Sequence, residues 1–327
     1  MTRANDTFVA AIDAGNTKTV AAVASADGLV RGYARGGSGN IYAGLSTVAL
    51  LGAVYREALA DAGLAPPDIT HLTLSATGAD WPEDFTDLRW LVLQNGWVQT
   101  SAALSVLNDA VGALWAGSPT GEGVAVAAGT SAGTAARRSA QVWHSSYWQQ
   151  TEGAVALGQK GLTAVYKAEL GLEQPTRLTQ AFLNTLELET PEGLLHAFTA
   201  RNPRLGAARA GDLARVLLDE AERGDKVAVR LAEALGDYAL VAAHKVGLEG
   251  AFPLVLIGGL MRHPGSVLKS ALLARVRREA PAATVQADAL EPVGGALCAS
   301  LEQTGFYTPS ARAQLRDTLP HATFFAT

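Results

Sequence analysis

The 327-residue sequence predicts an α/β protein built from two related halves that meet at a cleft. Short apolar segments alternate with longer amphipathic ones, which is typical of strands and helices in this fold class. The element order βββαβαβα fits residues 1–117, and a similar order restarts near residue 124. Each half also opens on an apolar strand that ends in a turn of small and hydroxyl residues, at positions 13–19 and 129–133.

The first half is predicted to hold three strands followed by alternating helices and strands. Ala26-Asp27-Gly28 supplies the turn between the second and third strands. Gly63 ends the first helix, and Pro66-Pro67 prevents its continuation. The predicted strands are residues 8–13, 17–25, 29–35, 69–76 and 103–107, and the predicted helices are 45–62, 82–93 and 109–116.

The second half repeats this pattern with extra helices. Its predicted strands are residues 124–128, 134–137, 141–147, 253–257 and 284–286, and its clearest helices are 154–170, 212–222, 227–246, 266–278 and 292–301. Residues 117–121 are rich in turn formers and are the predicted hinge. We therefore expect one domain over 1–117 and a second over 118–327, the second with a helical insertion and a last helix that packs back on the first.

Composition excludes several classes of protein. The net charge of −5, with scattered positive side chains, does not fit a nucleic-acid-binding protein. Cys298 is the only cysteine, so one chain can form no internal disulfide and no cysteine-built cluster or zinc site. The N-terminus lacks a signal-peptide pattern, and no stretch is long enough to span a bilayer. We expect a soluble cytoplasmic protein without nucleic-acid or membrane partners.

The turn after the first strand carries the strongest chemical signal. Asp13-Ala14-Gly15-Asn16-Thr17-Lys18-Thr19 joins two apolar strands in a predicted hairpin. Backbone amides and hydroxyls at such a turn can cradle phosphate, and an acid at the strand end can hold hydrated Mg²⁺. The pattern indicates nucleotide triphosphate chemistry on a hairpin, and an ordinary hairpin with a polar turn is the alternative.

The chain resembles the actin-like ATPase superfamily that contains sugar kinases, and within it the N-acetylglucosamine kinase and BadF/BadG ATPase family. The resemblance extends over residues 12–299 and implies two actin-like (ribonuclease H-like) βββαβαβα domains around a central cleft. Five blocks in family order carry it: residues 13–19, Gly36-Gly37-Ser38-Gly39-Asn40, Asn108-Asp109-Ala110, Gly129-Thr130, and Leu256-Ile257-Gly258-Gly259 with Glu291-Pro292-Val293-Gly294-Gly295-Ala296.

This resemblance implies ATP and Mg²⁺ as cofactors. Asp13 would bind the metal ion through water, and Gly258 with Gly259 would let the adenosine lie on the backbone. A plain strand-to-helix turn is the alternative for those two glycines, while Gly294-Gly295 is predicted to serve helix packing. The phosphates would be held from both halves, by Gly15, Asn16, Thr17, Lys18, Gly129 and Thr130.

Three further residues are implied to meet the sugar. Asp109 would accept the proton of the sugar hydroxyl and aim its oxygen at the γ-phosphorus, with a helix cap as the alternative. Asn40 resembles a sugar-binding asparagine, and a turn asparagine in the left-handed region is the alternative. Glu152 resembles an acid that hydrogen-bonds the sugar, and it could equally be a first-turn acid that stabilises the next helix.

The chain departs from the family pattern at two places. It has Gly129-Thr130-Ser131-Ala132 where the family usually has Gly-Thr-Gly-Ser. The segment 143–151 replaces a glycine-tryptophan-glycine stretch and puts Thr151 at the position of an aspartate. The aromatic side chains of that segment could stack on a sugar, although core packing is the favoured interpretation; they are Trp143, Tyr147 and Trp148.

We expect a homodimeric kinase that converts N-acetylglucosamine to its 6-phosphate with ATP. A BadF/BadG-type ATPase is one alternative, but Cys298 gives a dimer only two thiolates for an iron–sulfur cluster. A non-catalytic sugar sensor is another. A serine hydrolase is a third, because residues 129–133 match the G-x-S-x-G elbow around Ser131 and the histidines His244, His263 and His321 follow it. The remaining histidines, His71, His144 and His196, are predicted core or surface residues.

Overall fold

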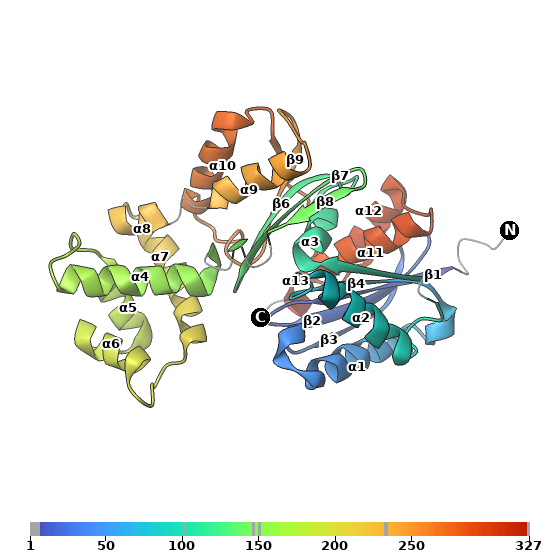
Figure 1. Cartoon of the computed structure of the whole chain (residues 1–327), viewed down its shortest axis with the longest axis horizontal. Helices are drawn as coiled ribbons and strands as arrows, with labels where there is room; N and C mark the ends of the chain where they lie inside the picture. The colour runs from blue at the N-terminus through green and yellow to red at the C-terminus, as the bar shows by residue number, and fades with distance from the viewer. Residues whose placement is uncertain (1–6, 101–102, 146–147, 150–151, 232–234, 326–327) are drawn as a thin grey trace.

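A computed structural model describes residues 7–100, 103–145, 148–149, 152–231 and 235–325, and it confirms the α/β fold class (Figure 1). The first sheet consists of β1 (Phe8–Ala14), β2 (Thr19–Ser25), β3 (Val30–Gly36), β4 (Ile69–Ala76) and β5 (Leu104–Asn108). Its strand order is β3-β2-β1-β4-β5. The first three strands pair antiparallel, and β4 and β5 continue the sheet in parallel with β1.

The second sheet repeats this topology. It consists of β6 (Gly123–Ala128), β7 (Ala132–Arg138), β8 (Gln141–His144), β9 (Pro253–Ile257) and β10 (Thr284–Val285). Its order, β10-β9-β6-β7-β8, places an antiparallel trio beside two parallel strands, as in the first sheet. The two halves predicted from the sequence therefore share one strand arrangement.

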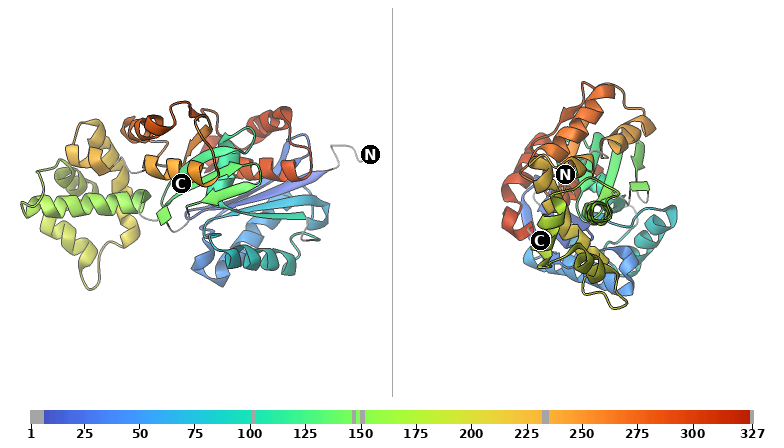
Figure 2. Two further views of the ribbon diagram at one scale, coloured as in Figure 1. Left: turned by 45° about the horizontal axis from the view of Figure 1, so that its top comes forward. Right: turned by 90° about the vertical axis from the view of Figure 1, so that its left-hand side faces the viewer.

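Helices cover both sheets, and a group of helices stands apart from the first sheet (Figures 1 and 2). The helices of the first half are α1 (Leu45–Asp61), α2 (Pro82–Gln94) and α3 (Asp109–Gly117). The separate group contains α4 (Ala154–Glu169), α5 (Leu178–Leu186), α6 (Pro191–Thr199), α7 (Ala210–Glu222) and α8 (Lys226–Leu231). The remaining helices are α9 (Leu235–Lys245), α10 (Val267–Glu279), α11 (Pro292–Gln303), α12 (Pro309–Thr318) and α13 (Ala322–Phe325).

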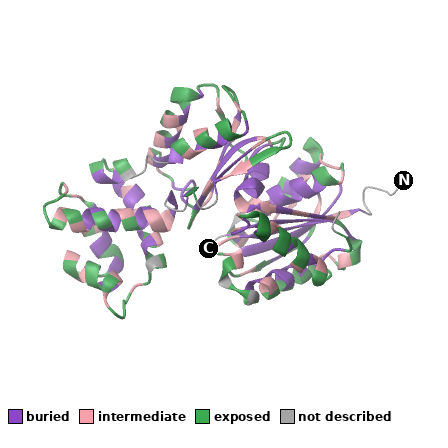
Figure 3. Ribbon diagram, in the orientation of Figure 1, coloured by how far each residue is buried: buried purple, intermediate pink, exposed green. Residues whose placement is uncertain are grey.

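The central strand β1 is buried on both faces, as the purple strands of Figure 3 show. Because side chains alternate along a strand, Val9 and Ala11 pack with α3 and α11, whereas Ala10 and Ile12 pack with α1. Helices on both faces explain why this strand is apolar at successive positions instead of alternating with polar residues.

Glycines in α11 allow it to pack closely on α3. A Cβ on Gly295 would lie 2.5 Å from the carbonyl oxygen of Gly112 and 2.4 Å from the amide nitrogen of Ala116. The predicted packing role of this glycine is confirmed. The same helix packs on β1 and β4, so residues 292–303 contact the first sheet although they follow the second in sequence. The domain boundary at residue 117 stays a prediction.

Some predicted elements differ from the observed ones. The structure has α8 and α9 in the stretch predicted as one helix over 227–246, and residues 232–234 between them lie outside the described part. The strand predicted over 141–147 ends at His144. The sequence pattern does not single out the short helices α5 and α12, because each spans only two or three turns and gives a brief periodic signal. No helix in the described ranges has the length and apolar character needed to cross a membrane.

Candidate active site

A cleft of about 840 Å³ opens between the two halves. Its walls come from the turns that follow β1, β3, β4, β6 and β9, together with the start of α3 and one face of α7. It is lined by almost all the residues singled out in the sequence: Asp13, Gly15, Asn16, Thr17, Lys18, Asn40, Asp109, Gly129, Thr130, Gly258 and Gly259.

The first loop of the cleft is the β1–β2 hairpin turn. The amide of Gly15 donates to the carbonyl oxygen of Lys18 at 2.9 Å and closes the turn. Asp13 lies at the end of β1 and is 8% exposed. Burial, and next the charge of Asp109, raise the pKa of the Asp13 carboxyl to about 7. Two carboxyl groups therefore share one poorly solvated region.

This region fits a hydrated magnesium ion. Burial also raises the pKa of the Asp109 carboxyl, so a bound cation would offset an unfavourable concentration of negative charge. Within the described ranges, no group of three or more acidic, histidine or cysteine side chains could hold a metal ion on its own. Mg²⁺ usually takes one or two carboxylates and completes its shell with water and phosphate oxygens, which matches this donor set.

The second loop, residues 129–131, connects β6 to β7 and rests on the start of α4. The amides of Ala154 and Val155 donate to the carbonyl oxygens of Gly129 and Thr130 at 2.9 and 3.2 Å. A Cβ on Gly153 would lie 2.4 Å from the Cα of Ser131, so only glycine allows this contact. The loop is thus held from behind, and its side chains face the cleft.

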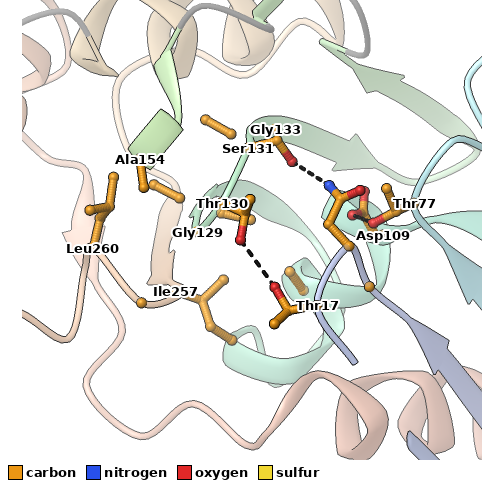
Figure 4. Close-up of a pocket in the computed structure, with 18 of the residues that line it drawn as sticks. Thr17, Thr77, Asp109, Gly129, Thr130, Ser131, Gly133, Ala154, Ile257 and Leu260 are labelled. Atoms are coloured by element: carbon orange, nitrogen blue, oxygen red, sulfur yellow. Dashed lines mark hydrogen bonds between the residues drawn. The ribbon is translucent and has the colours of Figure 1, made fainter. Parts of the chain in front are cut away.

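The two loops contact each other directly across the cleft. The hydroxyls of Thr17 and Thr130 lie 3.0 Å apart, and the side-chain nitrogen of Asn16 donates to the Ser131 hydroxyl at 2.8 Å (dashed in Figure 4). These loops come from different halves of the chain. A group held by both would therefore bridge the halves.

Asp109 is the first residue of α3 and lies beside the loop that follows β4. The side chain of Asn108 caps the helix by accepting from the amide of Ala110 at 3.0 Å, so the capping interpretation of Asp109 is wrong. The Thr77 hydroxyl donates to the Asp109 carboxylate, and Figure 4 shows the two side chains together. The carboxylate therefore has a fixed orientation at the cleft wall.

Asn40 is held by two hydrogen bonds. Its side-chain oxygen accepts from the amide of Tyr42 at 2.9 Å, and its side-chain nitrogen donates to Asn16 Oδ1 at 2.8 Å. Its φ of −61° is not in the left-handed region, so that interpretation is wrong. The Tyr42 ring, 53% exposed, also lines the cleft, and its hydroxyl donates to the Asp84 carboxylate at 2.9 and 3.0 Å.

The sequence reasoning missed the loop after β4. Thr77 and Asp80 line the cleft, and Asp80 accepts from the Asn108 side chain at 2.9 Å. The signal was available, because β4 lies between β1 and β5 and runs parallel to both. The carboxyl ends of parallel strands meet at one edge, so residues after β4 had to lie beside Asp13 and Asp109.

The two glycines after β9 have different roles. Gly258 has a φ of +105°, and a Cβ there would lie 2.4 Å from the carbonyl oxygen of Ala128, so the turn itself requires glycine. A Cβ on Gly259 would meet no atom within 4 Å, which leaves its backbone open to the cleft. Gly259 is the better placed of the two for close approach by a ligand.

Lys18 contacts the last described residues of the chain. Its ammonium donates to the carbonyl oxygen of Phe325 and lies 5.5 Å from the centre of the Phe325 ring. Burial lowers the pKa of Lys18. The Arg35 guanidinium likewise donates to the carbonyl oxygen of Phe324 at 2.7 Å. The segment α13 thus forms one wall of the cleft beside the first loop.

The segment from Trp143 to Glu152, where the sequence suggested contacts with the sugar, differs from expectation. Glu152 is buried and does not line the cleft, and its carboxylate lies 2.9 Å from Lys160 Nζ of α4. Because α4 begins at Ala154 after Gly153 and has no acid in its first turn, the first-turn alternative is wrong. Trp143 packs against the core of the second half, as expected. Trp148 is 76% exposed, so core packing is wrong for it. Tyr147 and Thr151 lie outside the described residues.

The hydrolase alternative is contradicted by topology. Ser131 lies between two antiparallel strands, β6 and β7, whereas a nucleophile elbow joins a strand to a helix. The Ser131 hydroxyl is bonded to Asn16. His263, which lines the cleft, is instead 2.9 Å from Asp219.

No protein-family model and no curated protein sequence matches the chain. Among solved structures, a provisionally named N-acetylglucosamine kinase from Chromobacterium violaceum is similar with a TM-score of 0.67 and 22% identity, covering 91% of this chain and 99% of that one. Another provisionally named N-acetylglucosamine kinase, from Porphyromonas gingivalis, has a TM-score of 0.63 and 18% identity, covering 90% of this chain and 98% of that one. A ROK family glucokinase from Streptomyces griseus, solved with glucose and AMPPNP, has a TM-score of 0.56 and 16% identity, covering 88% of this chain and 97% of that one. The chain shares the two-domain, actin-like fold of these proteins.

Proposed function

We propose that the protein is an ATP- and Mg²⁺-dependent kinase that phosphorylates a hydroxyl of an amino sugar, with N-acetylglucosamine and its 6-hydroxyl as the first substrate to test. One observation carries the proposal. The half-buried Asp109 carboxylate lines the same cleft as two opposed loops that touch each other through Thr17, Thr130, Asn16 and Ser131. An acid beside a two-sided phosphate grip is the arrangement that phosphoryl transfer to an alcohol requires.

Asp109 acts as the base. Its carboxylate, oriented by the Thr77 hydroxyl, accepts the proton of the sugar hydroxyl while the hydroxyl oxygen forms a bond to the γ-phosphorus. The bond between that phosphorus and the bridging oxygen breaks, and ADP leaves. Asn40 and Tyr42 line the cleft at the sugar side and would orient the ring. The raised pKa of Asp109 makes its carboxylate a stronger proton acceptor than an exposed one.

The hairpin turn and the loop 129–130 would hold the phosphates with amides and hydroxyls, and Lys18 would add positive charge. Asp13 would hold Mg²⁺ through water, and the ion supplies neutralisation of phosphate charge when bound. Lys18 now donates to Phe325, so its ammonium would exchange that carbonyl for a phosphate oxygen. Gly259 would face the adenosine, because its backbone is open to the cleft.

Two other functions share this fold and need separate tests. A BadF/BadG-type ATPase requires thiolates at a surface between subunits, but Cys298 is 0% exposed within α11, and burial raises the pKa of its thiol to about 11. This disfavours that alternative. A sugar sensor without transfer would bind sugar and release no ADP. The homodimer and the cytoplasmic location stay predictions.

A coupled ADP-release assay across hexoses, hexosamines and N-acyl hexosamines tests the proposal. We expect ADP release that depends on both Mg²⁺ and sugar, fastest with an N-acyl hexosamine. ADP release without any sugar would favour an ATPase. Sugar binding without ADP release would favour a sensor, and either result would contradict the kinase.

A further inference from the structure

We infer that Ser131 contacts the γ-phosphoryl group, and that Asn16 and Asn40 orient its hydroxyl for this task. The inference rests on the proposed use of ATP. It adds a residue on the second loop where the resemblance gives glycine, so it concerns this chain in particular.

A series of three hydrogen bonds, each donating toward the next residue, leads from Tyr42 to Ser131. The Tyr42 amide donates to Asn40 Oδ1 at 2.9 Å, Asn40 Nδ2 donates to Asn16 Oδ1 at 2.8 Å, and Asn16 Nδ2 donates to Ser131 Oγ at 2.8 Å. A backbone amide can only donate, so it sets the orientation of the first side-chain amide. Each side-chain amide then sets the next one.

The direction of this series leaves the Ser131 hydrogen available. Its oxygen already accepts from Asn16, and among the described residues the hydroxyl has no acceptor of its own. The side chain is exposed and lines the cleft. A hydroxyl that accepts one hydrogen bond is polarised and donates a stronger second one. It is therefore a prepared donor that lacks an anionic partner.

The backbone under Ser131 is fixed, which keeps this donor in place. Its carbonyl oxygen accepts from the Gly129 amide at 2.9 Å, and Gly153 packs against its Cα. The adjacent Thr130 meets Thr17 of the opposite loop at 3.0 Å. A phosphoryl group held between these loops would lie within reach of the Ser131 hydroxyl. Preorganised donors of this kind stabilise charge that develops during transfer.

The departure at this loop therefore relocates a hydroxyl. The resemblance places serine at position 132, but here Ala132 begins β7, pairs with Ala128 and is 8% exposed. Ser131, one residue earlier, faces the cleft. The altered motif keeps a hydroxyl donor available to the phosphates.

Calorimetric titration with two nucleotides tests this role. The full chain and its Ser131→Ala variant are titrated with Mg²⁺–AMPPNP, which carries a γ-phosphoryl group, and with Mg²⁺–ADP, which does not. We expect the variant to lose about tenfold or more in affinity for AMPPNP and to keep its affinity for ADP, because a hydrogen bond to a charged group is lost only with AMPPNP. Ser131→Thr, which keeps the hydroxyl, should retain most of the AMPPNP affinity.

Ser270→Ala on α10 is the matched control, since Ser270 is exposed and outside the cleft. Equal losses for both nucleotides would mean that Ser131 only supports the loop, and unchanged affinities would mean that it has no role; either result overturns the inference. Sugar turnover is not needed for this test, so a failed sugar screen leaves it valid. A wild-type chain that binds neither nucleotide would overturn both proposals.

Discussion

Replacing Asp13 by asparagine should stabilise the protein in the absence of nucleotide, while removing the carboxylate proposed to hold Mg²⁺. The Asp13 carboxyl has an ordinary pKa of 3.8, which burial and the charge of Asp109 raise to about 7 in the folded chain. Between these values the folded state binds a proton that the unfolded state has released. The free energy of unfolding therefore falls as pH rises through this window. The side-chain amide of the variant would carry no charge at any pH.

The magnitude follows from the same pKa values. At 1.36 kcal/mol per pKa unit, the interval from 3.8 to about 7 corresponds to about 4 kcal/mol at pH 8. At pH 5 only the part of the interval between 3.8 and 5 counts, which corresponds to about 1–2 kcal/mol. The Asp13→Asn variant should therefore exceed the wild type by about 1–2 kcal/mol at pH 5 and by about 4 kcal/mol at pH 8.

Urea unfolding followed by tryptophan fluorescence at pH 5 and pH 8, without Mg²⁺ or nucleotide, measures this difference. Asp317→Asn on α12 is the control, because Asp317 is exposed and does not line the cleft. It should change stability by no more than about 0.5 kcal/mol at either pH. A destabilised Asp13→Asn variant at pH 8, or a gain that is the same at both pH values, would refute the reasoning.

Two other substitutions test the packing and the sugar side. Gly295→Ala should lower the free energy of unfolding by about 1–3 kcal/mol, because its Cβ would meet backbone atoms of α3 at 2.4 and 2.5 Å. Gly206→Ala is the control, because a Cβ there meets no atom within 4 Å, and it should change the free energy of unfolding little. Equal urea midpoints for the two variants would contradict this prediction. Tyr42→Ala should raise the KM for sugar about tenfold, roughly 1.4 kcal/mol, and leave the KM for ATP unchanged. The reason is that the sugar could no longer stack on the exposed Tyr42 ring and bury its apolar face. Tyr42→Phe keeps the ring and should resemble the wild type, so an unchanged KM in Tyr42→Ala would exclude stacking.

The fold was largely predictable because its strands carry strong local signals. The apolar run of β1, its glycine turn and the apolar run of β2 predicted the hairpin, and the same pattern at β6 predicted the second half. Element ends moved by one to three residues, which reflects the weak local information at strand and helix termini. The short helices of the separate group depend on packing with α4 and α7.

The site was predictable only where a motif marked it. Asp13 lies at the end of β1 and Asp109 directly follows β5, each at a recognisable position. Thr77 and Asp80 carry no motif and are placed by sheet order alone. The contact between Lys18 and Phe325 joins residues that lie 307 positions apart, so no local pattern could reveal it. The capping role fell to Asn108 instead of Asp109 because the two side chains compete for one helix end, and sequence does not decide between neighbours.

Transfer of the γ-phosphoryl group from labelled ATP to N-acetylglucosamine, measured for the wild type and for Asp109→Asn, tests the central claim most directly. We predict labelled sugar phosphate from the wild type and a fall in kcat of about 10²–10⁴-fold in the variant, the range typical of a lost general base. The affinity for Mg²⁺–AMPPNP should remain within a few-fold in the variant. Undiminished transfer by Asp109→Asn, or no labelled product with any N-acyl hexosamine, would contradict the account.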